Sequence, residues 1–199
     1  MKKVILASIF PLLMTSAFSS LAANPAPLQI DGGKINFTGA VVSAPCAVDN
    51  VTDDQTVRLG QVPTNRLVGR GSTSSAVPFT IKLTGCDLSS ADVTDPTKPA
   101  SYTSASVTFS GSTVTDDSTL AILSAASGAG DTTTAAQNVG IQILQNNTAV
   151  KVDGSTATTA HKILVGTNEI PFSAVYVATA DGVVAGSANA IVNFLVNYE

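Results

Sequence analysis

The sequence predicts an all-β fold, in which antiparallel strands form a sandwich within a single domain. Apolar residues recur at every second position in most stretches, which is the period of a strand with one buried face. Short clusters of Gly, Asp, Asn and Ser separate these stretches and are typical of turns. Of the 199 residues, 44% are hydrophobic and only 12% are charged. Thr, Ser, Asn and Gln take most of the positions that are expected to face solvent.

Five strands follow from the alternation, and each is defined by the side chains that share its buried face. In chain order these sets are Val77, Phe79, Ile81 and Leu83; Val107 and Phe109; Val139, Ile141 and Ile143; Ile170, Phe172, Ala174 and Tyr176; and Ala190, Val192, Phe194, Val196 and Tyr198. Turns are expected at residues 127–131, 153–155, 166–168 and 181–182. One helical turn over residues 118–123 is a weaker prediction than any of the strands.

The first residues indicate export. Lys2 and Lys3 precede an apolar run over residues 4–14, and small residues follow up to Ala22. A basic start, a short apolar core and small residues at the cleavage position are typical of a secretory signal peptide. A membrane anchor is disfavoured because the apolar run is too short to span a bilayer. Residues 1–22 are therefore predicted to be a signal peptide.

Charge and cysteine content restrict the partners. Ten Lys and Arg against fourteen Asp and Glu make the chain acidic, whereas proteins that bind nucleic acids carry a basic stripe. Cys46 and Cys86 are the two cysteines, and in an exported protein such a pair usually forms a disulfide. A zinc site would need further Cys or His ligands, and a redox pair would normally be spaced Cys-x-x-Cys. We expect a structural disulfide and no nucleic-acid partner.

The sequence predicts no enzyme, no metal site and no cofactor. His161 is the single histidine, and its polar surroundings favour a solvated loop. No Gly-x-Ser-x-Gly elbow marks a nucleophilic serine. The adjacent acids at 53–54 and 116–117 lack the Asp-x-Asp-x-Asp-Gly pattern of a calcium loop and are interpreted as turn residues.

Two features do not fit a sandwich that is complete by itself. A strand-like segment before the first cysteine places four residues on one face: Gly33, Ile35, Phe37 and Gly39. The C-terminal strand stops at Glu199, where a sandwich usually continues into an edge strand. A long apolar strand beside an unfilled place is an aggregation site unless another strand covers it. Either another chain supplies that strand or the N-terminal segment folds back, and local patterning does not separate the two.

Several motifs in order along the chain resemble those of the major subunits of chaperone–usher fimbriae, the type 1 pilin-like family. They are residues 32–42, 44–48, 55–62, 75–86, 138–144 and 170–176, together with Gly186 and the penultimate Tyr198. The resemblance covers most of the chain after the signal peptide. It implies an incomplete immunoglobulin-like β-sandwich that lacks its last strand, in a subunit exported through the periplasm to an extracellular fimbrium on the bacterial surface.

The resemblance also implies how the missing strand is supplied. A donor strand from the N-terminal extension of a neighbouring, identical subunit completes the sandwich, a mode of strand addition known for pilins. A periplasmic chaperone lends a strand beforehand, and an outer-membrane usher is the site of exchange. The implied donor-strand residues are Gly33, Ile35, Phe37 and Gly39. The implied acceptor groove and chaperone-recognition residues are Gly186, Ala190, Val192, Phe194, Val196 and Tyr198.

The chain is thus expected to comprise a signal peptide (1–22), a donor-strand extension (23–40) and a pilin domain (41–199). Its predicted function is that of a structural fimbrial subunit that polymerises non-covalently and supports cell adhesion. A minor adaptor pilin or a carbohydrate-binding fimbrial adhesin module is the alternative. Tip adhesins of the family carry an additional lectin domain, for which the length leaves no room. The absence of Trp also leaves few aromatic platforms for a sugar.

Overall fold

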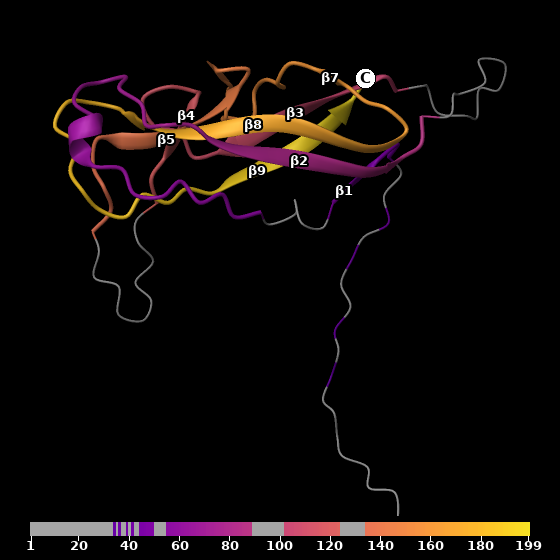
Figure 1. Cartoon of the computed structure of the whole chain (residues 1–199), viewed down its shortest axis with the longest axis horizontal. Helices are drawn as coiled ribbons and strands as arrows, with labels where there is room; N and C mark the ends of the chain where they lie inside the picture. The colour runs from indigo at the N-terminus through magenta and orange to yellow at the C-terminus, as the bar shows by residue number, and fades with distance from the viewer. Residues whose placement is uncertain are drawn as a thin grey trace, which may run out of the picture. The chain divides into compact units, whose positions relative to one another are not determined.

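The computed structural model describes residues 34, 36, 39, 41, 44–49, 55–88, 102–123 and 134–199. The predicted signal peptide, Gly33, Ile35, Phe37, the acids at 53–54 and the turn at 127–131 lie outside the described residues. Val41–Glu199 forms one compact unit. Its described part holds β-strands and one short 3-10 helix, η1 (Thr64–Arg66), so the all-β prediction is confirmed (Figure 1). Among the described residues, no helix is long and apolar enough to cross a membrane.

The larger of two antiparallel sheets has the order β1-β2-β8-β5-β4, and β6 pairs with β5 beside this path. Its strands are β1 (Ala47–Val48), β2 (Val77–Cys86), β4 (Thr119–Ala121), β5 (Val139–Gln145), β6 (Thr148–Ala149) and β8 (Gly166–Ala178). The long strands β2 and β8 pair along most of their length, from Val77 opposite Ala174 to Cys86 opposite Gly166.

The smaller sheet has three strands in the order β7-β3-β9. They are β3 (Ser104–Gly111), β7 (His161–Lys162) and β9 (Val192–Tyr198). The pairing of β3 with β9 runs from Ala105 opposite Tyr198 to Gly111 opposite Val192. Among the described strands, β9 pairs with β3 alone, so it forms an edge of this sheet.

The two sheets pack face to face, and aromatic residues connect the layers. Phe172 of β8 meets the ring of Phe109 of β3 edge-on at a centroid distance of 5.2 Å, and it stacks on Phe79 of β2 at 5.7 Å. The predicted alternation is seen in the core, which is formed by the inward side chains of both sheets. It comprises Ile81, Leu83, Ala105, Val107, Phe109, Ile141, Ile143, Ile170, Phe172 and Ala174, among others.

The turn predicted at residues 166–168 lies instead in β8, and a bend just before Gly166 reverses the chain. Asn168, which is 8% exposed, explains the shift. Its Oδ1 accepts a hydrogen bond from the Leu164 N–H at 2.8 Å, and its Nδ2 donates to the Leu164 carbonyl oxygen at 2.7 Å. The side-chain amide thus replaces a backbone partner and lets the chain turn through apolar residues.

Two further expectations were wrong, and one physical reason explains both. Residues 118–123, considered for a helical turn, contain the strand β4, which pairs with β5. His161, expected in a solvated loop, is half-buried in β7 opposite Ala105. In both cases a neighbouring strand supplies backbone hydrogen bonds that local sequence does not reveal.

Candidate assembly site

The edge strand β9 and the residues just before it carry five inward-facing apolar side chains, which we call the acceptor edge. They are Ala190, Val192, Phe194, Val196 and Tyr198, the residues predicted to line the acceptor groove together with Gly186. All five pack against the main core and all are half-buried. None of the five is enclosed, although each points toward the core.

Exposure changes abruptly between β3 and β9. Ala105 and Val107 of β3 are 0% exposed and Phe109 is 2% exposed. Their cross-strand partners on β9, in the same order, are Tyr198, Val196 and Phe194, and all three are half-buried. Strand β3 has a neighbouring strand on each side, whereas β9 has one described neighbour. The difference in exposure therefore arises because no described strand covers the outer side of β9. Burying the exposed apolar surface of β9 under another strand would be favourable by about 25 cal/mol per Å².

A second strand-like segment also lacks partners. Residues 55–62 belong to no helix or strand, and no backbone hydrogen bond joins them to another described residue. Val57, Leu59 and Val62 are nevertheless half-buried between exposed neighbours. Leu59 packs against the same core as the acceptor edge. Motif matching singled out this segment, but its lack of backbone partners is visible only in the structure.

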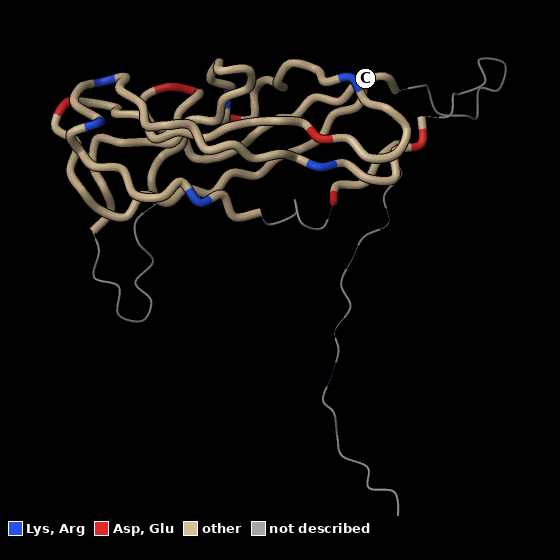
Figure 2. The backbone as a smooth tube through the Cα atoms, viewed as in Figure 1, with Lys and Arg blue, Asp and Glu red and all other residues tan. Residues whose placement is uncertain are grey.

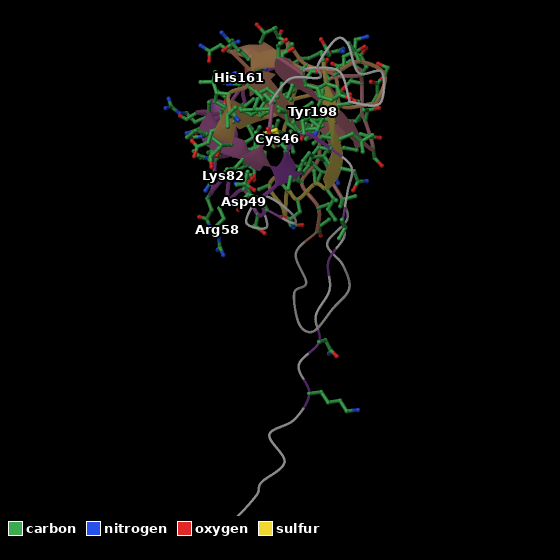
Figure 3. All side chains as sticks on the ribbon, turned by 90° about the vertical axis from the view of Figure 1, so that its right-hand side faces the viewer. Cys46, Asp49, Arg58, Lys82, His161 and Tyr198 are labelled. Carbon is green, nitrogen blue, oxygen red and sulfur yellow. A yellow bond between two sulfur atoms is a disulfide. The ribbon has the colours of Figure 1, made fainter. Side chains whose placement is uncertain are left out.

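The predicted disulfide between Cys46 and Cys86 is present and joins the residue before β1 to the end of β2. The Tyr198 hydroxyl donates a hydrogen bond to the Cys46 carbonyl oxygen at 3.1 Å. Figure 3 looks at this end of the unit and labels both residues. The ring of Tyr102 meets that of Tyr198 edge-on at 6.0 Å. The C-terminal strand is therefore tied to the larger sheet beside the disulfide.

A second tyrosine forms a hydrogen bond with the C-terminal segment, residues 188–198, where this segment begins. Tyr176 of β8 donates its hydroxyl hydrogen bond to the Ala188 carbonyl oxygen at 3.3 Å. Burial raises the pKa of both hydroxyls, those of Tyr176 and Tyr198, because the phenolate form is poorly solvated there. The sequence does not predict this contact, since no local pattern links a strand residue to a carbonyl oxygen twelve positions later.

Gly186 lies before β9 and contacts the backbone of residues 134–136. A Cβ at this position would lie 2.3 Å from the Thr134 oxygen and 2.5 Å from the Ala136 nitrogen. Ser187 next to it exchanges backbone hydrogen bonds with the same segment, at 3.0 Å to the Thr134 oxygen and 2.8 Å from the Ala136 nitrogen. Only glycine fits here without a backbone shift, and this contact is separate from the acceptor edge.

Of the predicted donor residues, the structure describes Gly39 alone. It is exposed, and a Cβ built on it would have no atom within 4 Å. The structure therefore does not test the roles of Gly33, Ile35 and Phe37, which stay predictions.

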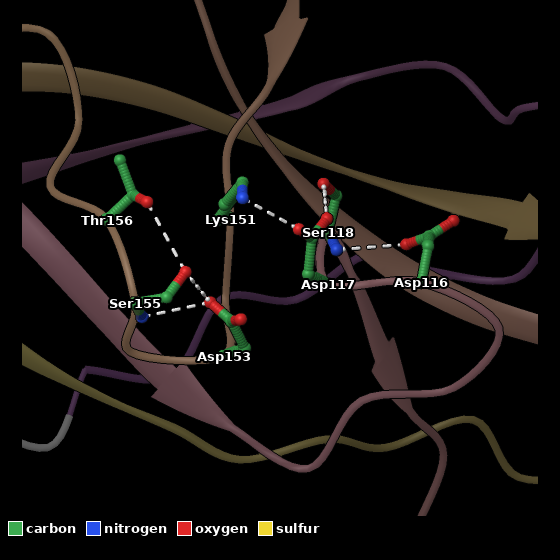
Figure 4. A network of polar contacts seen from close by, with 7 residues as sticks. All are labelled: Asp116, Asp117, Ser118, Lys151, Asp153, Ser155 and Thr156. Carbon is green, nitrogen blue, oxygen red and sulfur yellow. Dashed lines mark hydrogen bonds and ion pairs between the residues drawn. The ribbon is translucent and has the colours of Figure 1, made fainter.

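Charged groups are interspersed over the unit (Figure 2). The Lys151 ammonium lies 2.9 Å from the Asp117 carboxylate, and the Ser155 hydroxyl donates a hydrogen bond to the nearby Asp153 carboxylate (Figure 4). The hydrogen bond from Lys151 lowers the pKa of Asp117, and the Ser155 hydroxyl lowers that of Asp153. All lie at the surface, and within the described ranges no three acidic, His or Cys side chains gather in a metal-binding group. These contacts stabilise turns.

Comparison with known proteins agrees with this architecture. The family described as "Fimbrial protein" matches residues 35–199. The chain is 38% identical over 200 residues to the fimbrial subunit type 1 of Salmonella typhimurium, covering 100% of both chains. It is 40% identical over 188 residues to the type-1 fimbrial protein A chain of Escherichia coli K12, covering 94% of each.

A solved chain from a chaperone–usher pilus has a similar fold, with a TM-score of 0.67 at 24% identity. The match covers 87% of the present chain and 100% of that one. This likeness confirms the immunoglobulin-like, incomplete sandwich that the sequence predicts. The edge strand with its half-buried apolar face, the disulfide and the whole-chain similarity agree, and the protein is a member of the fimbrial protein family.

Proposed function

We propose that the chain is a structural fimbrial subunit that polymerises by donor-strand exchange, in which residues 31–40 of one subunit form a strand beside β9 of the next. The observation that carries the proposal is the exposure difference between cross-strand partners. Phe109 is 2% exposed whereas Phe194 opposite it is half-buried. This is expected of a strand that is interior in the assembled fibre and at the edge in the single chain.

The donor segment has the pattern that such a place requires. Residues 31–40 would span about 33 Å when extended, the length of a sandwich edge. Ile35 and Phe37 would bury apolar side chains against the acceptor edge, each worth about 1.5–3 kcal/mol. Gly33 and Gly39 have no Cβ and suit positions where the donor backbone approaches the core closely.

An added strand would also satisfy backbone groups on both of its sides. One edge of β9 has no described partner, and residues 55–62 have no backbone hydrogen bond to a described residue. Both pack against the same core. A strand between them would pair with each, which favours strand addition over a contact made by side chains alone.

The same edge would be covered by a periplasmic chaperone before assembly and filled by the next subunit at an outer-membrane usher. The similarity to a subunit of a chaperone–usher pilus supports these partners. On this route the chain leaves the cell through the periplasm and ends in a surface fimbria that supports adhesion. No finding favours the alternative of an adaptor pilin or a carbohydrate-binding adhesin module.

The test is to append a second copy of residues 31–40, through a short Gly/Ser linker, after Glu199 of the mature chain. We expect the copy to raise the melting temperature by about 10 °C or more, because its Ile35 and Phe37 side chains would be buried against the acceptor edge. We also expect it to keep the chain monomeric in size-exclusion chromatography. The matched control exchanges Lys34 with Ile35 and Asn36 with Phe37 in the copy, which keeps its composition and moves the anchors to the other face. Equal effects of the two copies, or no effect of either, would falsify the proposal.

A further inference from the structure

Two tyrosine hydroxyls connect the C-terminal segment, residues 188–198, to the larger sheet or the residue beside it. Tyr198 belongs to β9 of the smaller sheet, and its hydroxyl donates to the carbonyl oxygen of Cys46, beside β1 of the larger sheet, at 3.1 Å. Tyr176 belongs to β8 of the larger sheet, and its hydroxyl donates to the carbonyl oxygen of Ala188, in the segment that leads into β9, at 3.3 Å. The two hydrogen bonds thus hold the C-terminal segment at its beginning and at its end.

The two contacts lie at opposite ends of the acceptor edge. Tyr198 stands at the disulfide end, where Cys86 is paired with Gly166 at the start of β8. Tyr176 lies toward the other end of β8. Between the contacts at Ala188 and at Tyr198 are four inward-facing positions, which are Ala190, Val192, Phe194 and Val196. The donor residues predicted from the sequence are also four, namely Gly33, Ile35, Phe37 and Gly39, and Asp31 precedes them on the same face of the proposed donor segment.

Register is the property that these contacts control. A slip of the donor strand by one residue turns its apolar side chains to the wrong face and is excluded by the alternation itself. A slip by two residues keeps Ile35 and Phe37 on the correct face, so patterning does not exclude it. Such a slip moves a bulky anchor into the end position that glycine would otherwise occupy, next to a tyrosine. Hydrogen bonds have preferred lengths and directions, so these two hold the C-terminal segment at a set distance from the larger sheet at both of its ends.

We infer that Tyr176 and Tyr198 are positioning residues, whose hydroxyl contacts keep the unfilled edge at the width of one strand and limit the donor strand to one register. The inference rests on the proposed donor-strand function. A pre-ordered edge also binds more tightly, because less conformational freedom is lost when the donor strand arrives.

The chain contains a matched control. Tyr102 is the one remaining tyrosine of the three in the sequence, and its ring contacts that of Tyr198. Its hydroxyl, however, makes no hydrogen bond to any residue that the structure describes. Replacement of each tyrosine by phenylalanine removes the same atom, but among the described contacts only the replacements of Tyr176 and Tyr198 remove a hydrogen bond.

The experiment uses the mature chain with the appended donor copy, ligated as a synthetic peptide that carries 4-fluorophenylalanine at the position of Phe37. The ¹⁹F spectrum then shows one resonance for each register. We measure it for the unsubstituted chain and for Tyr176→Phe, Tyr198→Phe and Tyr102→Phe. For each chain we also measure how far the copy raises the melting temperature over the same chain without it. That difference cancels any general loss of stability.

We expect one resonance for the unsubstituted chain and for Tyr102→Phe. Tyr176→Phe and Tyr198→Phe should each show a second resonance and a smaller gain from the copy, with the preference for one register reduced about fivefold by the lost hydrogen bond. A single resonance and an unchanged gain in both variants would overturn the inference and leave the proposed function standing. If the copy fails to stabilise the unsubstituted chain, the proposed function itself is wrong.

Discussion

Phe109 and Phe194 are directly opposite each other on adjacent strands, and yet they differ sharply in exposure. Phe109 is 2% exposed and also meets Phe172 of the other sheet at 5.2 Å, whereas Phe194 is half-buried. Phe109 therefore contributes to the folded state of the single chain, and Phe194 retains apolar surface that assembly can still bury.

The two phenylalanines should respond differently to truncation. Phe109→Ala removes a fully packed ring and is expected to cost about 3–5 kcal/mol in the free energy of unfolding of the mature chain. Phe194→Ala should cost clearly less in the same chain, but should remove most of the stabilisation that an appended donor strand provides. Urea unfolding of both variants, with and without the appended strand, measures this. Equal costs in the single chain would show that β9 is already covered.

Gly186→Ala should destabilise the chain although the position is exposed. The added methyl group would lie within 2.3 Å of the Thr134 oxygen, so the backbone of residues 134–136 or of the C-terminal segment has to shift. We expect a loss of about 1–3 kcal/mol, measured as a lower melting temperature. Gly69→Ala is the control, because its Cβ would meet only the Asp181 side chain at an ordinary 3.4 Å. A melting temperature within one degree of that of Gly69→Ala would contradict this explanation.

Loss of the disulfide should weaken both the fold and the acceptor edge. The bond between Cys46 and Cys86 has a sequence separation of 40, for which the loop-entropy estimate is about 3–4 kcal/mol. It also fixes the segment whose carbonyl oxygen accepts the Tyr198 hydrogen bond. Urea unfolding with and without a reductant measures the loss. The Cys46→Ser/Cys86→Ser double variant is the control. Its urea midpoint should equal that of the reduced chain and should not change when the reductant is added.

Stability should fall at alkaline pH through Tyr176 and Tyr198. Burial raises the pKa of both hydroxyls in the folded chain, whereas in the unfolded chain they titrate near the usual value of about 10. The unfolded state therefore loses protons first. The stabilisation is complete below pH 10 and declines as the pH rises through the folded-state pKa. The Tyr176→Phe/Tyr198→Phe chain should lose less stability between pH 9 and pH 11 than Tyr102→Phe. Equal losses of stability in the two chains would contradict a role for the hydroxyls of Tyr176 and Tyr198.

Much of the fold follows from local sequence. The alternation predicts the inward faces of β2, β3, β5, β8 and β9 correctly, because a strand with one buried face repeats every two residues wherever it lies. The disulfide was also predictable, since Cys46 and Cys86 are the only cysteines of the chain. The motifs identified the family, and they did so without any knowledge of which strand lies at an edge.

The position of a strand in its sheet is decided by residues far away in the chain, and no local pattern contains it. Val107 and Val196 have the same inward orientation, and each belongs to a period-two alternation of apolar residues. Only the order β7-β3-β9 encloses the first and leaves the second half-buried. The same applies to the hydroxyl contacts of Tyr176 and Tyr198, which depend on how the two layers face each other. The sequence by itself thus determined the inward faces of five strands, the disulfide and the family. The tertiary structure decided where the sandwich is left open, because exposure depends on contacts between distant segments.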